Sequence, residues 1–447
     1  MTTESTPTPG QRCARAREIL LAGDPREAFR EARPVLAYPA APEGPALREA
    51  LEVMGAIAAA LDDEKLASAL GWASERLDDA EALYDAAYAL YEQKLHDLAA
   101  GLLSRANRLS PGSPTVVTEL AANLEALLLH GAACEVLRAS GLVETDATCE
   151  YLYGYNALLS GDVEAARPVA ASLRACTDHS LAYMGAALGG MVERADALRG
   201  ASALDDHDLA GWHLVLNGAV LLHLSPHGYD EPMRGRYAYV ADSYERLREG
   251  LDRLALALGA AQITVPRVVA LPDRSSRILA RAAAQRLRVP CEDWSEAPDE
   301  RPALLVAYDL DRVGSADALQ RLREHLPGQV LFAHASCWTD PFPFAPDVVT
   351  FLYQTNVAPW DAGRMTVDPE TRAVRPGEAD ESPEEVLAAR IIEAGGEHES
   401  MSTREQLVAL ITAARGVREE AAAGLFRTDG SRLRERMGSP VQSARFT

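Results

Sequence analysis

The chain has 447 residues, of which 48% are hydrophobic and 25% are charged. These proportions are those of a globular protein with two to three domains, and they exclude a largely disordered chain. The formal net charge of -22 makes nucleic acid a poor partner unless basic residues gather on one face, whereas a basic protein or peptide would suit an acidic surface.

Targeting and metal-binding signals are missing. No apolar run reaches the roughly 18 residues that a membrane span requires, and the first residues lack the apolar core of a signal peptide. We therefore expect a cytoplasmic protein without a membrane partner. The six cysteines form no Cys-x-x-Cys pair, so neither a zinc ribbon nor a disulfide framework is indicated. Lys65 and Lys94 are the only lysines, which excludes Schiff-base enzymes, Walker-type phosphate loops and protein kinases for the remainder of the chain.

Small residues recur at a nearly constant interval in the first half. Ala87 and Ala121 are 34 residues apart, and Ala121 and Gly154 are 33 apart. A second series keeps the same interval: Ala99, Ala133 and Ala166. The antiparallel helices of a hairpin approach closely only where small side chains face each other. The pattern predicts an array of five or six helical hairpins.

The turn sequence between the helices points to a known repeat. The segment 158–166, with Gly161 before Asp162, has the glycine that ends one helix and the acidic residue that starts the next, and residues 23–28 repeat this chemistry. Residues 12–203 resemble the tetratricopeptide-repeat family, although the family's tryptophan and most of its tyrosine positions are missing. Another helical-hairpin array is the alternative.

The resemblance implies a partner-binding groove. Tetratricopeptide arrays hold a helix or an extended peptide in a concave groove lined by the first helix of each hairpin. The candidate groove residues are Tyr84, Tyr88, Tyr91, Asn123, Tyr151, Tyr155 and Asn156. The alternative for each is ordinary helix surface or packing between repeats.

Beyond about residue 205, apolar runs of strand length alternate with amphipathic helices. The expected strands are 267–271, 303–308, 329–333 and 348–353. The expected helices are 237–258, 275–287, 315–325, 383–394 and 403–424, with a loop or small hairpin at 360–380. This alternation predicts an α/β domain over residues 205–425 with a mainly parallel sheet. Residues 426–447, rich in arginine, glycine and serine, are expected to form a flexible basic tail that could fold back on the acidic body.

Ligands of open α/β sheets bind beyond the carboxyl ends of the strands, which directs attention to three loops. In the first, the side chains of Arg274, Ser275 and Ser276 and the free N–H groups of a helix start could hold an anion. The alternative is that Asp273 or Ser275 caps the helix. A further candidate, Asn356, lies in the loop after the last strand.

The remaining loop, Tyr308 to Ser315, carries two carboxylates. Asp309 and Asp311, followed by Gly314 and Ser315, could hold Mg²⁺ and through it a phosphate. Residues 268–317 resemble the layout of a type I phosphoribosyltransferase with a degenerate signature loop, in which Arg312-Val313 stands where threonines are expected. Haloacid-dehalogenase phosphatases and glycosyltransferases share the Asp-x-Asp spacing. The alternative is a carboxylate pair that caps the following helix.

Four histidines, His207, His213, His223 and His227, lie close together in sequence beside several aspartates. Pro226 breaks the i, i+4 pairing of a helical two-histidine site, so no metal centre is predicted.

Dinucleotide, hydrolase-elbow, zinc-protease and EF-hand motifs are absent from the sequence, and no catalytic residue is identified. The preferred hypothesis is a protein-binding adaptor with a solenoid and an accessory, non-catalytic α/β domain that needs no cofactor. The alternative is a Mg²⁺-dependent enzyme of phosphoribosyl- or glycosyltransferase type that acts on a phosphorylated or nucleotide ligand at Asp309 and Asp311.

Overall fold

The computed structural model describes residues 7–227, 233–297, 299–362, 365–367, 372, 374–395, 399–415, 417–419, 422–423, 430–436 and 438–443. The chain divides into two compact units, residues 1–188 and residues 189–447. In the described part of the chain, we find no helix with both the length and the hydropathy needed to cross a bilayer.

The first unit consists of helical hairpins. The helices are α1 Pro9–Leu21, α2 Pro25–Leu36, α3 Gly44–Ala60, α4 Glu64–Glu75, α5 Ala80–Glu92, α6 His96–Leu109, α7 Pro114–Ala126, α8 His130–Ser140, α9 Ala147–Leu159 and α10 Val163–Arg174, followed by α11 His179–Ala197. Many start at an aspartate whose side chain accepts a backbone N–H of the first turn, as at Asp24, Asp63, Asp79, Asp146 and Asp162. The repeated turn chemistry therefore marks the helix starts.

The small residues of the repeat lie where helices touch. Ala87, Ala121 and Ala166 are fully buried. A Cβ atom added at Gly154 would approach Val169 Cγ1 to 2.6 Å, and one at Gly185 would approach Leu173 Cβ to 2.6 Å, both too close for a side chain. The predicted helical repeat is confirmed, because the 33- to 34-residue interval places small residues at these close approaches.

The second unit contains a seven-stranded sheet in which the neighbouring strands are parallel. Its strands are β1 Val220–Leu221, β2 Tyr237–Ala241, β3 Val268–Ala270, β4 Cys291–Asp293, β5 Ala303–Asp309, β6 Gln329–Cys337 and β7 Val348–Val357. The order is β1-β7-β6-β5-β3-β4, and β2 pairs with the same edge of β7 as β1 does, nearer the carboxyl end of β7. The sequence predicted this mainly parallel α/β fold.

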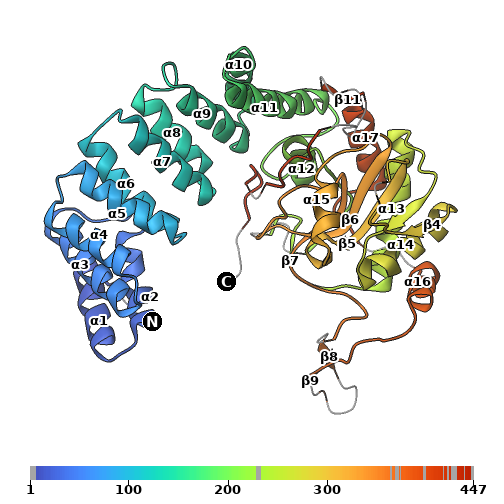
Figure 1. Ribbon diagram of the computed structural model, residues 1–447, viewed down its shortest axis with the longest axis horizontal. Helices are drawn as coiled ribbons and strands as arrows, with labels where there is room; N and C mark the ends of the chain where they lie inside the picture. The colour runs from blue at the N-terminus through green and yellow to red at the C-terminus, as the bar shows by residue number, and fades with distance from the viewer. Residues whose placement is uncertain are drawn as a thin grey trace. The chain divides into compact units, whose positions relative to one another are not determined.

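Helices cover both faces of the sheet. Helices α13 Tyr244–Ala261 and α14 Arg274–Leu287 pack on one face, and α16 Glu384–Glu393 and α17 Arg404–Ala414 lie outside them (Figure 1). On the other face, α15 Ala316–Leu322 buries Ala318 and Leu322 against Leu305 and Leu331. Helix α12 Leu209–Asn217 packs beside β1. Successive side chains of β5 therefore point alternately toward α14 on one face of the sheet and toward α15 on the other.

Two expected helices differ from the structure. Residues 237–241, expected to be helical, form β2, and α13 begins only after Ser243, whose side chain accepts the N–H of Arg246. The expected helix at 403–424 ends at Ala414, and a short hairpin follows, β10 Arg418–Glu419 with β11 Ala422–Ala423. The hairpin allowed for at 360–380 is present as β8 Met365–Val367 and β9 Val374–Pro376.

The described part of the predicted flexible tail is held by the α/β unit. Arg432 forms a buried ion pair with Asp347 at 2.6 Å and donates from Nε to the carbonyl of Leu322 at 2.8 Å. The N–H of Arg436 donates to Asn217 Oδ1 at 2.9 Å, and Glu435 is buried. Residues 430–436 and 438–443 therefore lie back on the α/β unit and make buried polar contacts with it.

Candidate functional site

Three tyrosines form an aromatic stripe on α5, which we call the tyrosine stripe. Tyr84, Tyr88 and Tyr91 are spaced so that they share one side of the helix. Their rings stack at centroid distances of 6.4 and 6.1 Å, and His96 contacts the last ring edge-on at 5.5 Å. Tyr88 is 44% and Tyr91 40% exposed, while Tyr84 is half-buried. The stripe therefore leaves two aromatic rings partly exposed on the surface of α5.

Acidic groups lie beside the stripe. Burial raises the pKa of Tyr84, and the nearby carboxyl of Glu119 on α7 raises it further. Burial also raises the pKa of Glu119. Glu92 pairs with Lys65. A second stacked pair, Tyr151 and Tyr155 on α9, has a centroid distance of 5.7 Å. The candidate groove tyrosines thus form two stacked groups, three rings on α5 and two on α9, and each of these is the first helix of its hairpin.

The two asparagines proposed for the groove do not face a ligand, and this part of the prediction is corrected. Asn123 and Asn156 are fully buried. Asn123 Oδ1 lies 3.0 Å from His96 Nδ1, and Asn156 Oδ1 lies 2.9 Å from His130 Nδ1. Each pair joins the second helix of one hairpin to the first helix of the next, so the asparagines hold neighbouring repeats together.

In the second unit, the predicted ligand loops meet at the place where the strand order reverses. Strand β3 has β4 on one side and β5 on the other. Helix α14, which follows β3, and helix α15, which follows β5, pack on opposite faces of the sheet. Such a reversal opens a crevice that commonly holds ligands. The loops starting at Leu271 and Leu310 border this crevice.

The side chains predicted to bind an anion at α14 already have partners within the chain. Asp273 accepts the N–H of Ser276 at 2.9 Å, and Ser276 Oγ accepts the N–H of Tyr308 at 2.9 Å. Arg274 Nη2 donates to the carbonyl oxygens of Asp380 and Ser382 at 2.7 and 3.0 Å. The arrangement matches the capping alternative, in which Asp273 starts the helix.

The segment after β7 fills the crevice. Trp360 Nε1 donates to Ser275 Oγ at 2.9 Å, and the Trp360 ring lies 5.6 Å from that of Tyr308. Asp361 pairs with Arg312 at 2.5 Å. We call Trp360 and Asp361 the crevice plug. Both residues belong to the loop after β7 that was expected to line a site, but no internal contact was predicted for either of them.

The unpaired groups that remain in the crevice are acceptors. Asp273 Oδ2 and Asn356 Oδ1 are buried without a hydrogen-bond partner, while Asn356 Nδ2 donates to Tyr308 Oη at 3.1 Å. Burial raises the pKa of Asp273. Phosphate oxygens need donors, so these groups do not suit a phosphorylated ligand.

Asp309 and its neighbours also bond within the chain. Asp309 Oδ1 accepts the N–H of Asp311 at 3.1 Å, and its Oδ2 accepts the hydroxyl of Tyr353. Asp311 is exposed, Gly314 has open space around it, and Ser315 caps α15 by accepting the N–H of Ala318 at 3.2 Å. Burial raises the pKa of Asp309 to about 6.

Near the end of the chain, Glu435 places a third carboxyl group close to those of Asp309 and Asp311. Ser336 Oγ donates to its two oxygens at 2.8 and 3.0 Å. Burial, with Asp309 and Asp311 nearby, raises the pKa of Glu435 to about 8. No local sequence pattern indicates this contact, because Ser336 and Glu435 are 99 positions apart.

A second buried polar cluster lies under α13. Asp242 accepts the hydroxyl of Tyr308 at 2.8 Å and lies 3.2 Å from His334 Nε2, while His334 Nδ1 is 3.2 Å from Thr350 Oγ1. Burial raises the pKa of Asp242, but His334 and Arg246 outweigh it and the pKa is lowered overall. Asp242, Tyr308 and His334 are all buried, so they order the sheet rather than meet a ligand.

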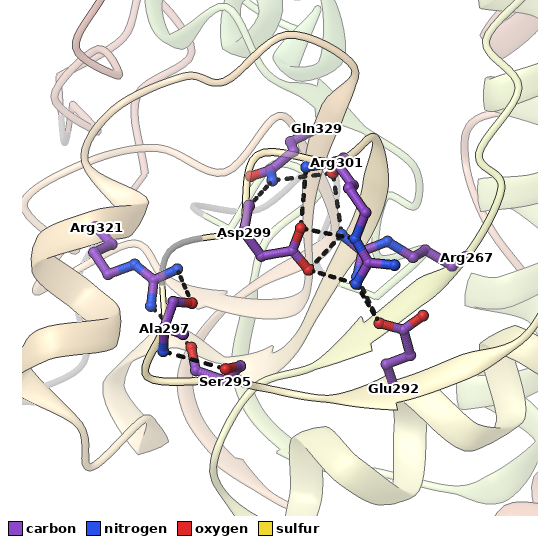
Figure 2. A network of polar contacts seen from close by, with 8 residues as sticks. All are labelled: Arg267, Glu292, Ser295, Ala297, Asp299, Arg301, Arg321 and Gln329. Carbon is purple, nitrogen blue, oxygen red and sulfur yellow. Dashed lines mark hydrogen bonds and ion pairs between the residues drawn. The ribbon is translucent and has the colours of Figure 1, made fainter.

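A cavity of about 350 Å³ lies beneath the loop that joins β4 to β5. Arg267 pairs with Glu292 and Asp299, each at 2.9 Å, and Arg301 adds contacts to the same two carboxylates (Figure 2). Gln329 and Arg321 hold backbone carbonyls of the loop. Because its charges are paired with each other, the network anchors the loop in place of a crossover helix.

The histidine run does not form one site. His213 contacts Asn217, and His223 lies 2.7 Å from Tyr237 Oη. Among the described residues, the group with metal-ligand spacing is Asp205, Asp206 and His207, and all three are exposed. Exposed acidic groups of this kind are common without an ion.

No family model and no curated protein matches this chain.

Proposed function

We propose that this protein is an adaptor whose helical repeats, of tetratricopeptide type, bind a segment of a partner protein at the tyrosine stripe. The observation that carries the proposal is the exposure of stacked rings in a unit whose other large side chains are mostly buried. Exposed aromatic residues on a rigid helix supply contact area at little entropic cost, and they are frequent in binding hot spots.

The charge of the repeat unit suggests the chemistry of the partner. Residues 1–188 contain 27 acidic and 15 basic residues. Glu119 and Asp85 lie next to Tyr84. Arginine side chains stack on tyrosine faces and also pair with carboxylates, so a peptide that combines arginine with apolar residues fits this surface.

Selection from a random peptide library tests the proposal on the full-length protein. We expect the selected peptides to be rich in arginine and to bind Tyr88→Ala with Tyr91→Ala at least tenfold more weakly, since hot-spot aromatics contribute 2 kcal/mol or more. Tyr183→Ala, which removes another exposed tyrosine of the same unit, is the control and should bind as the wild type does. Equal binding to the wild type and the double variant would exclude the stripe.

The enzyme hypothesis has one observation in its favour, the position of Asp309 and Asp311 at the reversal of strand order. Thermal unfolding of the full-length protein with Mg²⁺ and a panel of nucleotides and sugar phosphates tests it. A ligand at a hundred times its Kd would stabilise the fold by about 2.7 kcal/mol. A stabilisation that disappears in Asp311→Asn would favour the enzyme; no response would leave the α/β unit with an accessory role.

A further inference from the structure

A small cavity in the α/β unit contains two buried hydrogen-bond donors without an acceptor. It lies between α12, the start of β2 and the C-terminal segment, and Arg236, His213, Trp338 and Glu435 are among the residues that line it. Its volume of about 20 Å³ is enough for one water-sized species.

The first donor is Arg236, a cation with no counter-ion. Its side chain is 4% exposed, and its Nη1 has no hydrogen-bond partner. The guanidinium lies 5.4 Å from the Trp338 ring, and none of the described carboxylates forms an ion pair with it. Burial lowers the pKa of Arg236 to about 10, so the group is charged at neutral pH. An unpaired buried charge is strongly destabilising unless an ion joins it.

The second donor is His213, whose tautomer is set by a chain of contacts. The N–H of Arg436 donates to Asn217 Oδ1 at 2.9 Å, which orients the amide so that Nδ2 donates to His213 Nδ1 at 3.1 Å. Burial, and then the charge of Arg236, lower the pKa of His213 to about 3. The ring is therefore neutral with its proton on Nε2, and this buried nitrogen has no partner.

We propose that this cavity binds one monovalent anion of about the size of chloride, held by Arg236 Nη1 and His213 Nε2. Such an ion accepts both hydrogen bonds and neutralises the guanidinium. A water molecule could accept the hydrogen bonds but would leave the charge uncompensated. Arg436 and Ser439 also line the cavity, so the bound anion stabilises the docking of the C-terminal segment.

Thermal unfolding of the full-length protein at constant ionic strength tests the site, with gluconate replaced stepwise by chloride or bromide. We expect a saturating rise in Tm of about 3 °C at ten times the Kd, and no such rise with sulfate, which is too large for the cavity. Arg236→Met should lose the response. In gluconate it should unfold at the same temperature as the wild type or higher, because an unpaired charge is removed.

Arg434→Met is the matched control, since Arg434 is exposed on the same segment and does not line the cavity. It should respond to chloride as the wild type does. The proposal is overturned if the Tm of the wild type does not rise with chloride, or if the Tm of Arg236→Met rises as much as that of the wild type. If Arg236→Met does not fold, wild-type crystals soaked in bromide decide: an anomalous peak between Arg236 and His213 supports the site, and its absence contradicts it.

Discussion

The tyrosine stripe and the crevice between β3 and β5 both lie where their folds commonly place ligands, but they use their side chains differently. Tyr88 and Tyr91 keep large parts of their rings exposed. In the crevice, Arg274 and Ser275 bond to the chain itself, and Trp360 is 1% exposed. The contrast teaches that a pattern can bring polar groups to a favoured place without leaving them available for a ligand.

The crevice plug is expected to contribute most to stability. Trp360 packs between Tyr244 and Tyr308 and donates to Ser275, so Trp360→Ala would leave a cavity and an unpaired hydroxyl. We expect the free energy of unfolding of the α/β unit to fall by about 3–5 kcal/mol, measured by urea denaturation. Trp72→Ala, at a half-exposed tryptophan of the repeat unit, should cost far less. A loss below about 1 kcal/mol for Trp360→Ala would mean that the plug can leave the crevice open to a ligand.

The buried carboxyl of Glu435 should make the same unit sensitive to pH. Its pKa is raised to about 8 by burial and by Asp309 and Asp311, so the protonated form is favoured in the folded protein. Its stabilising effect is complete below the unfolded pKa of about 4.3 and is lost as the pH rises through about 8. Asp309, with its pKa raised to about 6, acts in the same direction.

Glu435→Gln should therefore resist alkaline destabilisation. We expect the variant to gain about 2–3 kcal/mol relative to the wild type between pH 5 and pH 9, measured as the difference in unfolding free energy. Glu381→Gln, at an exposed carboxylate of the same unit, should show no such gain. Parallel pH profiles for the wild type and Glu435→Gln would show that this carboxyl is ionised in the folded protein.

In the repeat unit, the contacts of Asn123 and Asn156 should contribute to the stability of the fold, whereas the tyrosine stripe should contribute little to it. Asn156→Ala removes the partner of His130 and a hydrogen bond of 3.0 Å to Glu125, and it leaves a buried imidazole unpaired. We expect a loss of about 1–3 kcal/mol, measured by calorimetry. In a double-mutant cycle with His130→Ala, the two losses should not add. Additive losses would show that the two side chains stabilise the unit independently.

The repeat and the sheet could be predicted because they depend on local patterns. The 33-residue interval of small residues reports close helix packing, and the runs in β5, β6 and β7 are apolar enough to be buried on both faces. Strand β1 was missed because two residues are too few to form a pattern, and β4 was missed because Cys291–Asp293 is a largely exposed, acidic segment with no apolar run. Strand β2 was assigned to a helix because its pattern runs into that of α13.

The availability of the candidate site residues could not be predicted, because it depends on contacts distant in sequence. Arg274 is bonded by carbonyls more than a hundred residues later, and Glu435 reaches Ser336 from the chain end. Asn123 and Asn156 repeat with the period of the array, a regularity that fits a groove and an inter-repeat contact equally well. Only their full burial separates the two interpretations.

The smallest effect on stability is expected at the tyrosine stripe. Because Tyr88 is 44% exposed and its hydroxyl has no described hydrogen-bond partner, Tyr88→Ala removes only the stacking with Tyr84 and Tyr91. We expect the free energy of unfolding to change by about 0.5 kcal/mol or less, measured by urea denaturation of the full-length protein. Asn156→Ala, in the same unit, serves as the structural reference. If Tyr88→Ala were as destabilising as that variant, the stripe would be part of the packing of the repeats, and the exposed rings would no longer point to a partner.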